Sequence, residues 1–572
     1  MPIQQLTTPR GDALLQALAK DPGHKPWNVY PRPQLVREGW INLNGYWDYT
    51  VSDGPEPENY DRRILVPFPP ESSLSGVGEH APEGAWHCYR LRFSLEEIPA
   101  GKRLLFHCGG ADQLCVLRFN GVGFGSRFPL LDGDFTEELT GFRAGENEIC
   151  LSVQDDLNNR THPWGKQSLR RGGMWYTPVS GIWQTVWLEW VPETSVEDLR
   201  LTPDLTCCAV EVRMRTGEGI RPAEGSLLFE GKTVPLEDGR AVLRPSEPRL
   251  WTPEDPRLYS FSVLVGEDRA ASYFALRTVS IGTVDGIPRI LLNGKPRFFN
   301  GLLDQGWWPD GLWTPADPAC YEDDLKAARD LGFPMVRKHI KVEPELYYHA
   351  CDRLGVVVFQ DMMNNGPYSF FRDTLLPTLG LQRLPQYLRR RRSLQAFTFA
   401  QHMKVTVRRL YNHPSILYWT IFNEGWGQQD TAAMYDKLKA LDPTRIVDTT
   451  SGWFRVGKTD VDSRHVYFRR FRMPRPKKPV VLSEYGGYVW KVTGHSFNPD
   501  KTYGYRLFSD REAWQAALEG LIAGQIVPAI PKGLCAAVYT QLSDVEDETN
   551  GLLTYDRRVV KPLRGISIDT AP

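Results

Sequence analysis

The chain has 572 residues, of which 41% are hydrophobic and 24% charged, so it has the composition of an ordinary globular protein with room for several domains. Its formal net charge is −1, so no broad basic surface indicates a nucleic-acid or membrane partner, and we expect neither. Nine Cys without a C-x-x-C spacing match neither a zinc ribbon nor a disulfide framework, so buried reduced thiols are expected.

The ends of the chain carry no targeting or membrane signal. Residues 1–20 lack the apolar core of a signal peptide, and the apolar stretch 521–540 is interrupted by two prolines and a lysine. A cytoplasmic location is therefore expected. The one strongly basic run, Arg389–Arg392, is interpreted as a solvated helix face or loop rather than a nucleic-acid patch.

The first half of the chain has the pattern of a β protein. Residues 1–36 are polar and rich in proline, and we expect an extended arm on the first domain with a short helix over 12–20. Residues 37–192 contain short alternating runs such as 89–93 and a hairpin signal at Asn120-Gly121, which predict a jelly-roll-like β-sandwich. Residues 193–283 contain further short strands and predict a smaller, immunoglobulin-like β-sandwich.

Residues 284–572 alternate between strand and helix patterns. Helices are expected over 322–332, 343–355 and 394–412, and each is followed by an apolar strand. This length and alternation are typical of a (β/α)8 TIM barrel. The whole chain is thus predicted to be a multidomain protein of β and α/β class.

Two predicted barrel strands end in glutamate. The apolar run 416–422 precedes Asn423 and Glu424, and the run 480–482 precedes Ser483 and Glu484. Because the carboxyl ends of barrel strands meet at one mouth, we expect the two carboxylates to lie together. Other strand ends carry polar or aromatic candidates for the same mouth, namely Asp304, Gln305, Trp307, Arg337, His339, Asp361, Tyr467 and Gln541.

A carboxylate pair in a sugar-binding mouth can cleave a glycosidic bond. One group protonates the leaving oxygen, and the other attacks C1 or activates water; separations of roughly 5–5.5 Å mean retention and roughly 6.5–9.5 Å inversion. An ion pair or a metal site is the alternative for each glutamate. The chain has 11 His and no H-x-x-x-H pair, so no metal site and no required cofactor are predicted, and no ligand set supports a divalent cation.

Three motifs resemble glycoside hydrolase family 2, and the resemblance covers nearly the whole chain. Residues 416–428 resemble the family's acid/base strand, and residues 480–488 resemble its nucleophile strand. Residues 173–189 resemble the closing strands of its N-terminal sugar-binding sandwich. The resemblance implies a retaining exo-β-glycosidase with a carbohydrate substrate. Assembly into a homo-oligomer is possible on this basis.

The resemblance also implies a role for each site residue. Glu484 would form the covalent glycosyl-enzyme, and Glu424 would be the acid/base, with its pKa raised by the nearby carboxylate. Asn423 would bond the sugar 2-hydroxyl, and Tyr467 corresponds to a tyrosine that touches the nucleophile, with a core tyrosine as the alternative. The remaining candidates are expected around the sugar, and a barrel-rim or core role is the alternative for each.

The sugar itself is less well defined by the resemblance. Glucuronide-cleaving members carry an Asn-x-Lys motif near the last strand, whereas residues 548–552 here read Glu-Thr-Asn-Gly-Leu, which disfavours a glucuronide. His339 stands one residue earlier than in many β-galactosidases, and residues 351–361 resemble the β-mannosidase branch. The predicted substrate is a β-galactoside or a related glycoside. Mannoside or uronide specificity, a non-catalytic carbohydrate-binding protein and a metal-dependent hydrolase are the alternatives.

Overall fold

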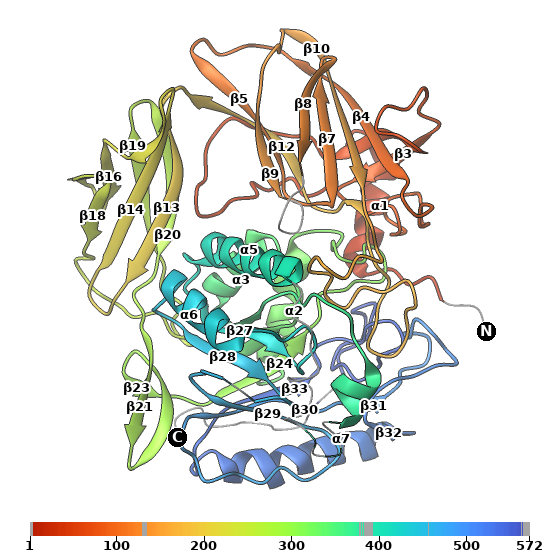
Figure 1. The fold of residues 1–572 in the computed structure, drawn as a ribbon, viewed down its shortest axis with the longest axis vertical. Helices are drawn as coiled ribbons and strands as arrows, with labels where there is room; N and C mark the ends of the chain where they lie inside the picture. The colour runs from red at the N-terminus through yellow and green to blue at the C-terminus, as the bar shows by residue number, and fades with distance from the viewer. Residues whose placement is uncertain are drawn as a thin grey trace.

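The computed structural model describes residues 4–127, 134–376, 379, 381, 393–455, 457–561 and 563. The basic run Arg389–Arg392 lies outside the described residues. Figure 1 shows three units: a β-sandwich at the top, a smaller β unit at the left and a barrel in the lower half. In the part of the chain described, no helix is both long and apolar enough to cross a membrane.

The first unit is a β-sandwich of two antiparallel sheets. One sheet has the order β1-β12-β5-β9, the other has the order β3-β2-β4-β10-β7-β8, and β6 pairs with β11. Alternating apolar residues of both sheets form one buried core that includes Trp47, Phe106 and Leu151. The strands are β1 (Trp40–Asn42), β2 (Gly45–Ser52), β3 (Arg62–Val66), β4 (Trp86–Leu95), β5 (Lys102–Cys108), β6 (Ala111–Asp112), β7 (Leu114–Phe119), β8 (Val122–Arg127), β9 (Phe135–Leu139), β10 (Gly145–Gln154), β11 (Gly181–Ile182) and β12 (Val186–Pro192).

The second unit is a smaller antiparallel sandwich. Strand β14 pairs with β13, β15 and β18, and the facing sheet has the order β17-β16-β19-β20. A three-stranded sheet, β21-β22-β23, leads into the barrel, and the predicted boundary at 283/284 falls inside its first hairpin. The strands are β13 (Ser195–Pro203), β14 (Cys208–Thr216), β15 (Gly219–Pro222), β16 (Ser226–Phe229), β17 (Lys232–Pro235), β18 (Arg240–Leu243), β19 (Tyr259–Val265), β20 (Asp268–Phe274), β21 (Val279–Val284), β22 (Ile287–Leu292) and β23 (Lys295–Pro296).

The third unit is an eight-stranded parallel barrel, as the sequence predicts. Its hydrogen-bonded order is β28-β27-β26-β25-β24-β33-β30-β29, so β28 and β29 face each other across an unpaired seam. Apolar side chains such as Phe359 and Tyr418, whose rings stack at 4.2 Å, fill its interior. The strands are β24 (Phe299–Asp304), β25 (Met335–Lys338), β26 (Val357–Asp361), β27 (Ile416–Asn423), β28 (Ile446–Ser451), β29 (Asp462–Val466), β30 (Val480–Gly486) and β33 (Leu534–Thr540).

Helices follow the barrel strands and cover their outer face. The helix α3 ends at Gly355, whose φ of +68° closes the last turn, and Asp510 caps α7 by accepting from the backbone N–H of Ala513 at 2.8 Å. A π-helical turn lies at Phe371–Leu375, and α7 continues through a π turn (Ile522–Ile526) and a 3-10 turn (Val527–Ala529). The helices are α2 (Ala319–Asp330), α3 (Glu345–Leu354), α5 (Ser393–Leu410), α6 (Thr431–Leu441) and α7 (Arg511–Leu521), and a short parallel pair is formed by β31 (Tyr488–Trp490) and β32 (Arg506–Phe508).

The N-terminal arm contains the expected helix but packs differently from the prediction. The helix α1 (Pro9–Lys20) begins at Thr8, whose hydroxyl and backbone N–H both donate to Asp310 of the barrel. Its apolar residues Leu14 and Leu18 belong to a core that includes barrel side chains. The arm therefore joins the sandwich to the barrel, because the same core also includes Leu65 and Phe68 of the first unit, and α1 lies between the two units in Figure 1.

Candidate active site

Glu424 is aimed into the barrel mouth by a left-handed turn. All eight residues of β27 are buried, and the strand ends at Asn423. Glu424 itself has φ +52°, and Gly425 follows with φ +74°. A non-glycine residue in this region costs of order 1–3 kcal/mol, and such strain persists where the surrounding structure holds it. Here the Glu424 N–H donates to the Ser451 carbonyl of β28 at 2.9 Å.

Glu484 lies within the buried strand β30 and is 4% exposed. Its Oε1 accepts from Arg337 at 3.0 Å, and its Oε2 accepts from the Tyr467 hydroxyl. Burial and the Glu484 charge raise the pKa of Tyr467 well above its ordinary value, so the phenol stays a neutral donor. Tyr467 thus lies in contact with Glu484, which is the position that the family resemblance implies for it.

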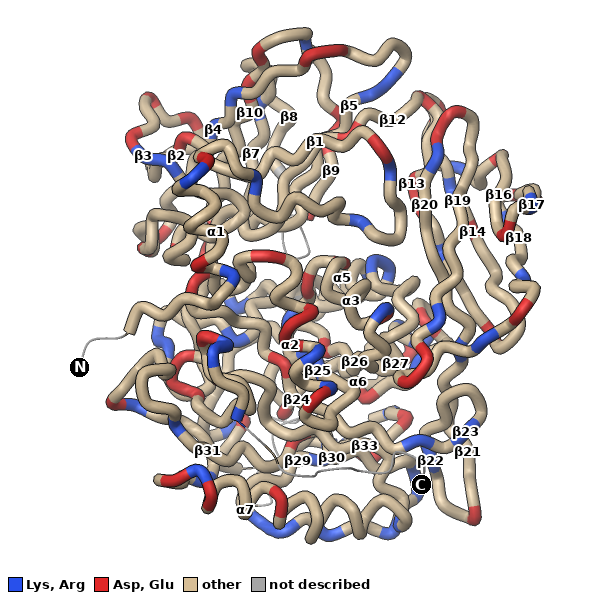
Figure 2. Tube along the Cα trace, turned by 180° about the vertical axis from the view of Figure 1, so that it is seen from behind, with Lys and Arg blue, Asp and Glu red and all other residues tan. Residues whose placement is uncertain are grey.

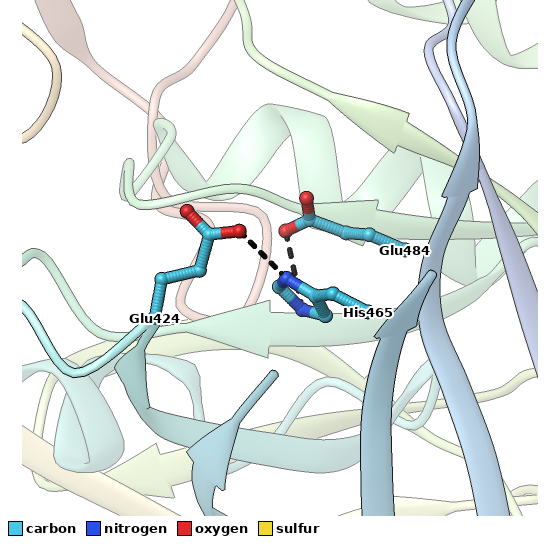
Figure 3. Close-up of side chains that lie close together, drawn as sticks. All are labelled: Glu424, His465 and Glu484. Atoms are coloured by element: carbon cyan, nitrogen blue, oxygen red, sulfur yellow. Dashed lines mark hydrogen bonds and ion pairs between the residues drawn. The ribbon is translucent and has the colours of Figure 1, made fainter. Parts of the chain in front are cut away.

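His465 of β29 stands between the two glutamates (Figure 3). Its Nδ1 is 2.8 Å from Glu424 Oε1, and its Nε2 is 3.5 Å from Glu484 Oε1. One ligand atom from each of the three residues lies within 4.8 Å of the others. This bridging role was not anticipated from the sequence, where His465 is one of four polar residues in a five-residue strand.

Arg337 is the central cation of the mouth. Its guanidinium donates to Asp361 Oδ1 at 3.0 Å, to Glu484 at 3.0 Å and to Asn423 Oδ1 at 2.9 Å. Burial lowers its pKa, but the charges of Asp361 and Glu484 outweigh burial and raise it, so the guanidinium stays charged. The sequence-predicted residues Arg337, Asp361, Asn423 and Glu484 are thus joined in one network.

The pKa of Glu424 corrects one expectation. The nearby carboxylate was expected to raise it. Burial does raise the pKa of Glu424, but the hydrogen bond and charge of His465 outweigh burial, with help from Lys166 and Arg337, so the pKa lies below its ordinary value. The prediction considered only one carboxylate beside another and left out the imidazole between them.

His339 and Asp361 form a buried pair beside this network. His339 Nδ1 lies 2.7 Å from Asp361 Oδ2, and the imidazole is 2% exposed. Burial and the positive charge of Lys166 lower the pKa of His339 to about 4, so it is neutral at pH 7. A neutral histidine orients Asp361, which in turn holds Arg337.

Two buried amides lie at adjacent strand ends with atoms free to bind a ligand. Gln305 Nε2 donates to Gln541 Oε1 at 2.8 Å. Gln305 Oε1 and Gln541 Nε2 are buried and have no hydrogen-bond partner among the described residues. One acceptor and one donor are therefore available together, which is the pattern that a sugar hydroxyl satisfies.

The other two candidates lie in different surroundings. The Asp304 carboxylate accepts from Lys338 at 3.1 Å and from Tyr347 at 2.8 Å, in a buried network that also includes Glu343. Trp307 is 1% exposed, and its ring packs against Tyr176 of the sandwich unit and against Trp313. Asp304 thus makes barrel-rim hydrogen bonds and Trp307 packs as a core aromatic, and contact of either residue with a sugar stays a prediction.

A loop of the first unit completes the mouth. Trp164 and Trp175 stack with ring centroids 5.2 Å apart, and Trp164 contacts Trp426, two residues after Glu424, at 4.7 Å. Lys166 of this loop is 9% exposed, and its charge lowers the pKa values of Glu424 and His339. Its ammonium has no ion pair or hydrogen bond within the described part of the chain. No local motif marks Lys166, because it comes from another unit.

Taken together, the fold and the site define a class: β-sandwich units followed by a TIM barrel with a carboxylate pair at its mouth. Residues 287–518 match the family model described as "Glycosyl hydrolases family 2, TIM barrel domain". Residues 287–518 therefore belong to the TIM barrel domain of glycoside hydrolase family 2.

Relatives and solved structures agree with this placement. The chain is 26% identical to a β-galactosidase of Photobacterium profundum over 482 residues, which are 77% of this chain and 43% of the relative, and it is similarly related to β-galactosidase 2 of Enterobacter cloacae. The chain thus spans less than half the length of these relatives. Its fold resembles a family 2 β-galacturonidase of Eisenbergiella tayi (TM-score 0.65, 18% identity) and a β-D-glucuronidase of Dictyoglomus thermophilum (TM-score 0.70, 17% identity), each covering 92% of this chain and 96% of that structure.

Proposed function

We propose that the chain is a retaining exo-β-glycosidase in which Glu484 is the nucleophile and Glu424 the acid/base. The observation that carries this proposal is the closeness of the two carboxylates, which have oxygens within 4.8 Å of each other at the barrel mouth. Retaining enzymes have their carboxyl groups roughly 5–5.5 Å apart, whereas inverting enzymes need roughly 6.5–9.5 Å to admit a water.

In the first step, Glu484 attacks C1 of the sugar and the bond to the leaving oxygen breaks. Arg337 donates to one oxygen of Glu484 and Tyr467 donates to the other, so they fix the direction of the attacking carboxylate. In this proposal Asn423, whose Oδ1 accepts from Arg337, bonds the sugar 2-hydroxyl. The negative charge of Glu484 is lost as the ester forms.

The leaving oxygen must receive a proton at the same time. Because the pKa of Glu424 is lowered, we assign the proton to the Glu424–His465 pair as a unit, which the 2.8 Å bond allows them to share. Glu424 delivers the proton to the leaving oxygen, and the imidazole replaces it. In the second step the same pair removes a proton from water, which attacks C1 and releases Glu484.

The nucleophile assignment is tested by chemical rescue. Glu484→Ala should lower turnover of an aryl β-glycoside by about 10⁴-fold or more, because the covalent route is lost. Azide should restore part of the rate and give the glycosyl azide of inverted configuration, seen by NMR. Glu512→Ala, an exposed glutamate at the start of α7, is the matched control and should retain full activity. A rescued product of unchanged configuration would contradict the assignment.

A β-galactoside is the proposed sugar. The curated relatives are β-galactosidases, and the free amide atoms of Gln305 and Gln541 suit a neutral hydroxyl. A panel of aryl β-glycosides tests this choice, and kcat/KM should be highest for the galactoside. A panel on which no member is cleaved favours a non-catalytic carbohydrate-binding protein.

A uronide is the second candidate, and the observation that favours it is Lys166. This buried ammonium acts on two carboxylates at a mouth without Asn-x-Lys: burial raises the pKa of Glu548 and the Lys166 charge opposes that rise, while the same charge helps to lower the pKa of Glu424. A sugar carboxylate would pair with it. If the uronide is the true substrate, glucuronide or galacturonide exceeds galactoside in the same panel, and Lys166→Met removes that preference.

A further inference from the structure

The segment 464–478 is strongly basic. It contains seven Arg or Lys and no Asp or Glu, in a chain whose formal net charge is −1. Elsewhere, positive and negative residues are interspersed along most of the chain (Figure 2). A basic run is often only a solvated surface. Whether this one can bind a ligand of the enzyme depends on its position relative to the active site.

Several of these arginines line a hollow that also includes His465, the residue between the two catalytic glutamates. The hollow has a volume of about 480 Å³, and its walls include Arg455, Arg464, Arg469, Arg470 and Arg472 together with His465 and Trp453. Arg469 and Arg470 also line a neighbouring hollow of about 570 Å³. Trp453 follows β28 and His465 lies in β29, so the first hollow sits at the unpaired seam of the barrel.

The positive charge in this hollow is only partly compensated. Arg455 and Arg464 both pair with Asp462, at 2.7 and 2.8 Å. Arg469 and Arg472 are exposed, and neither has an ion pair or side-chain hydrogen bond among the residues described. Unpaired like charges around one hollow repel each other, and an anion placed between them relieves that repulsion.

The hollow lies on the side where the leaving group must be. The acid/base has to touch the glycosidic oxygen, so the leaving group continues from Glu424. Glu424 bonds Ser451 of β28 and His465 of β29, the two strands that flank the hollow. Trp453, half-buried and 5.7 Å from the His465 ring, offers an apolar face on this path.

Resting on the proposed glycosidase function, we propose that this hollow is the leaving-group subsite and that it takes a saccharide bearing a carboxylate or a sulfate. The planar guanidinium fork binds both anions through two parallel hydrogen bonds. The substrate class is then an acidic oligosaccharide whose terminal sugar is neutral and whose next unit is charged.

The test compares the binding and turnover of charged disaccharides with those of matched neutral disaccharides. One pair is galactosyl-glucuronic acid and its methyl ester; the other is galactosyl-glucose with and without a 6-sulfate. Calorimetry on the Glu484→Gln protein measures binding, and kcat/KM on the unaltered protein measures turnover. We expect the anionic member of at least one pair to bind about tenfold more tightly at low salt, with the advantage lost at 0.5 M NaCl. The two pairs distinguish a carboxylate from a sulfate.

The variants separate this site from general surface charge. Arg469→Ala/Arg472→Ala should remove the preference for the anion and leave the binding of the neutral disaccharides unchanged. Arg475→Ala/Lys477→Ala removes the same charge from the same segment but outside the hollow, and should retain the preference. The proposal is overturned if the charged and the neutral disaccharides bind equally, or if the preference for the anion survives the loss of Arg469 and Arg472. Anion binding without any hydrolysis contradicts the glycosidase function instead, and leaves the site standing.

Discussion

The chemistry of the two carboxylates depends on the groups that hold them. Arg337 and Tyr467 each donate to one oxygen of Glu484, whereas His465 shares a hydrogen bond of 2.8 Å with Glu424. The two glutamates themselves are predictable from sequence, because each follows an apolar strand. The role of the histidine between them is not predictable, because it depends on how three strands are placed relative to one another.

Replacing His465 tests the shared proton. His465→Asn should lower kcat by at least about tenfold for an alkyl glycoside, whose leaving oxygen needs a proton, because general acid catalysis contributes about 10²–10⁴-fold. A dinitrophenyl glycoside needs no proton, so its first step should change little. Steady-state and burst kinetics with both substrates measure this split. An equal loss on both would show that His465 acts only in holding the structure.

At the scale of elements, the active-site turn after β27 is as important as the strand. Strands and helices of the barrel follow from the alternation of apolar runs, and the predicted ranges agree with α3, α5 and β27. The partner of α1 could not be predicted, because an amphipathic pattern shows which face is apolar but not which unit covers it. The left-handed turn at Glu424 also carries no sequence signal beyond Gly425.

Gly425→Ala tests the turn. A Cβ at Gly425 would lie 1.8 Å from the Phe454 ring, at φ +74°, so the turn must shift and Glu424 with it. We expect kcat to fall by about 100-fold, as small misplacements of a catalytic group do. Gly494→Ala has φ +82° and open space around it, so it should cost only about 1–2 kcal/mol of stability. Similar activity in both variants would contradict this account of the turn.

At the scale of the whole molecule, the mouth is built from two units. The sandwich loop brings Trp164 and Lys166 to the barrel, about 250 residues before Glu424 in the chain. Contacts of this kind depend on how the units are placed, so sequence patterns within one unit do not reveal them. The same placement packs Trp307 against Tyr176 of the sandwich unit, a contact that sequence patterns within the barrel do not reveal.

Lys166→Met tests the contribution of the sandwich loop. The Lys166 charge lowers the pKa of Glu424, so removing it raises that pKa. The limb of the kcat/KM profile that requires the proton on the Glu424–His465 pair should therefore move to higher pH. Lys326→Met, an exposed lysine of α2, is the control and should leave the profile unchanged. A profile unmoved in Lys166→Met would show that the loop does not act on Glu424.

The most direct test of the central claim is covalent trapping of the nucleophile. A 2-deoxy-2-fluoro galactosyl fluoride slows release of the sugar from the enzyme, so a glycosyl-enzyme should accumulate. Intact-mass spectrometry should show one added sugar, and peptide mapping should place it on Glu484. Label on another residue, or turnover of an aryl galactoside without any trapped sugar, would contradict a double displacement through Glu484.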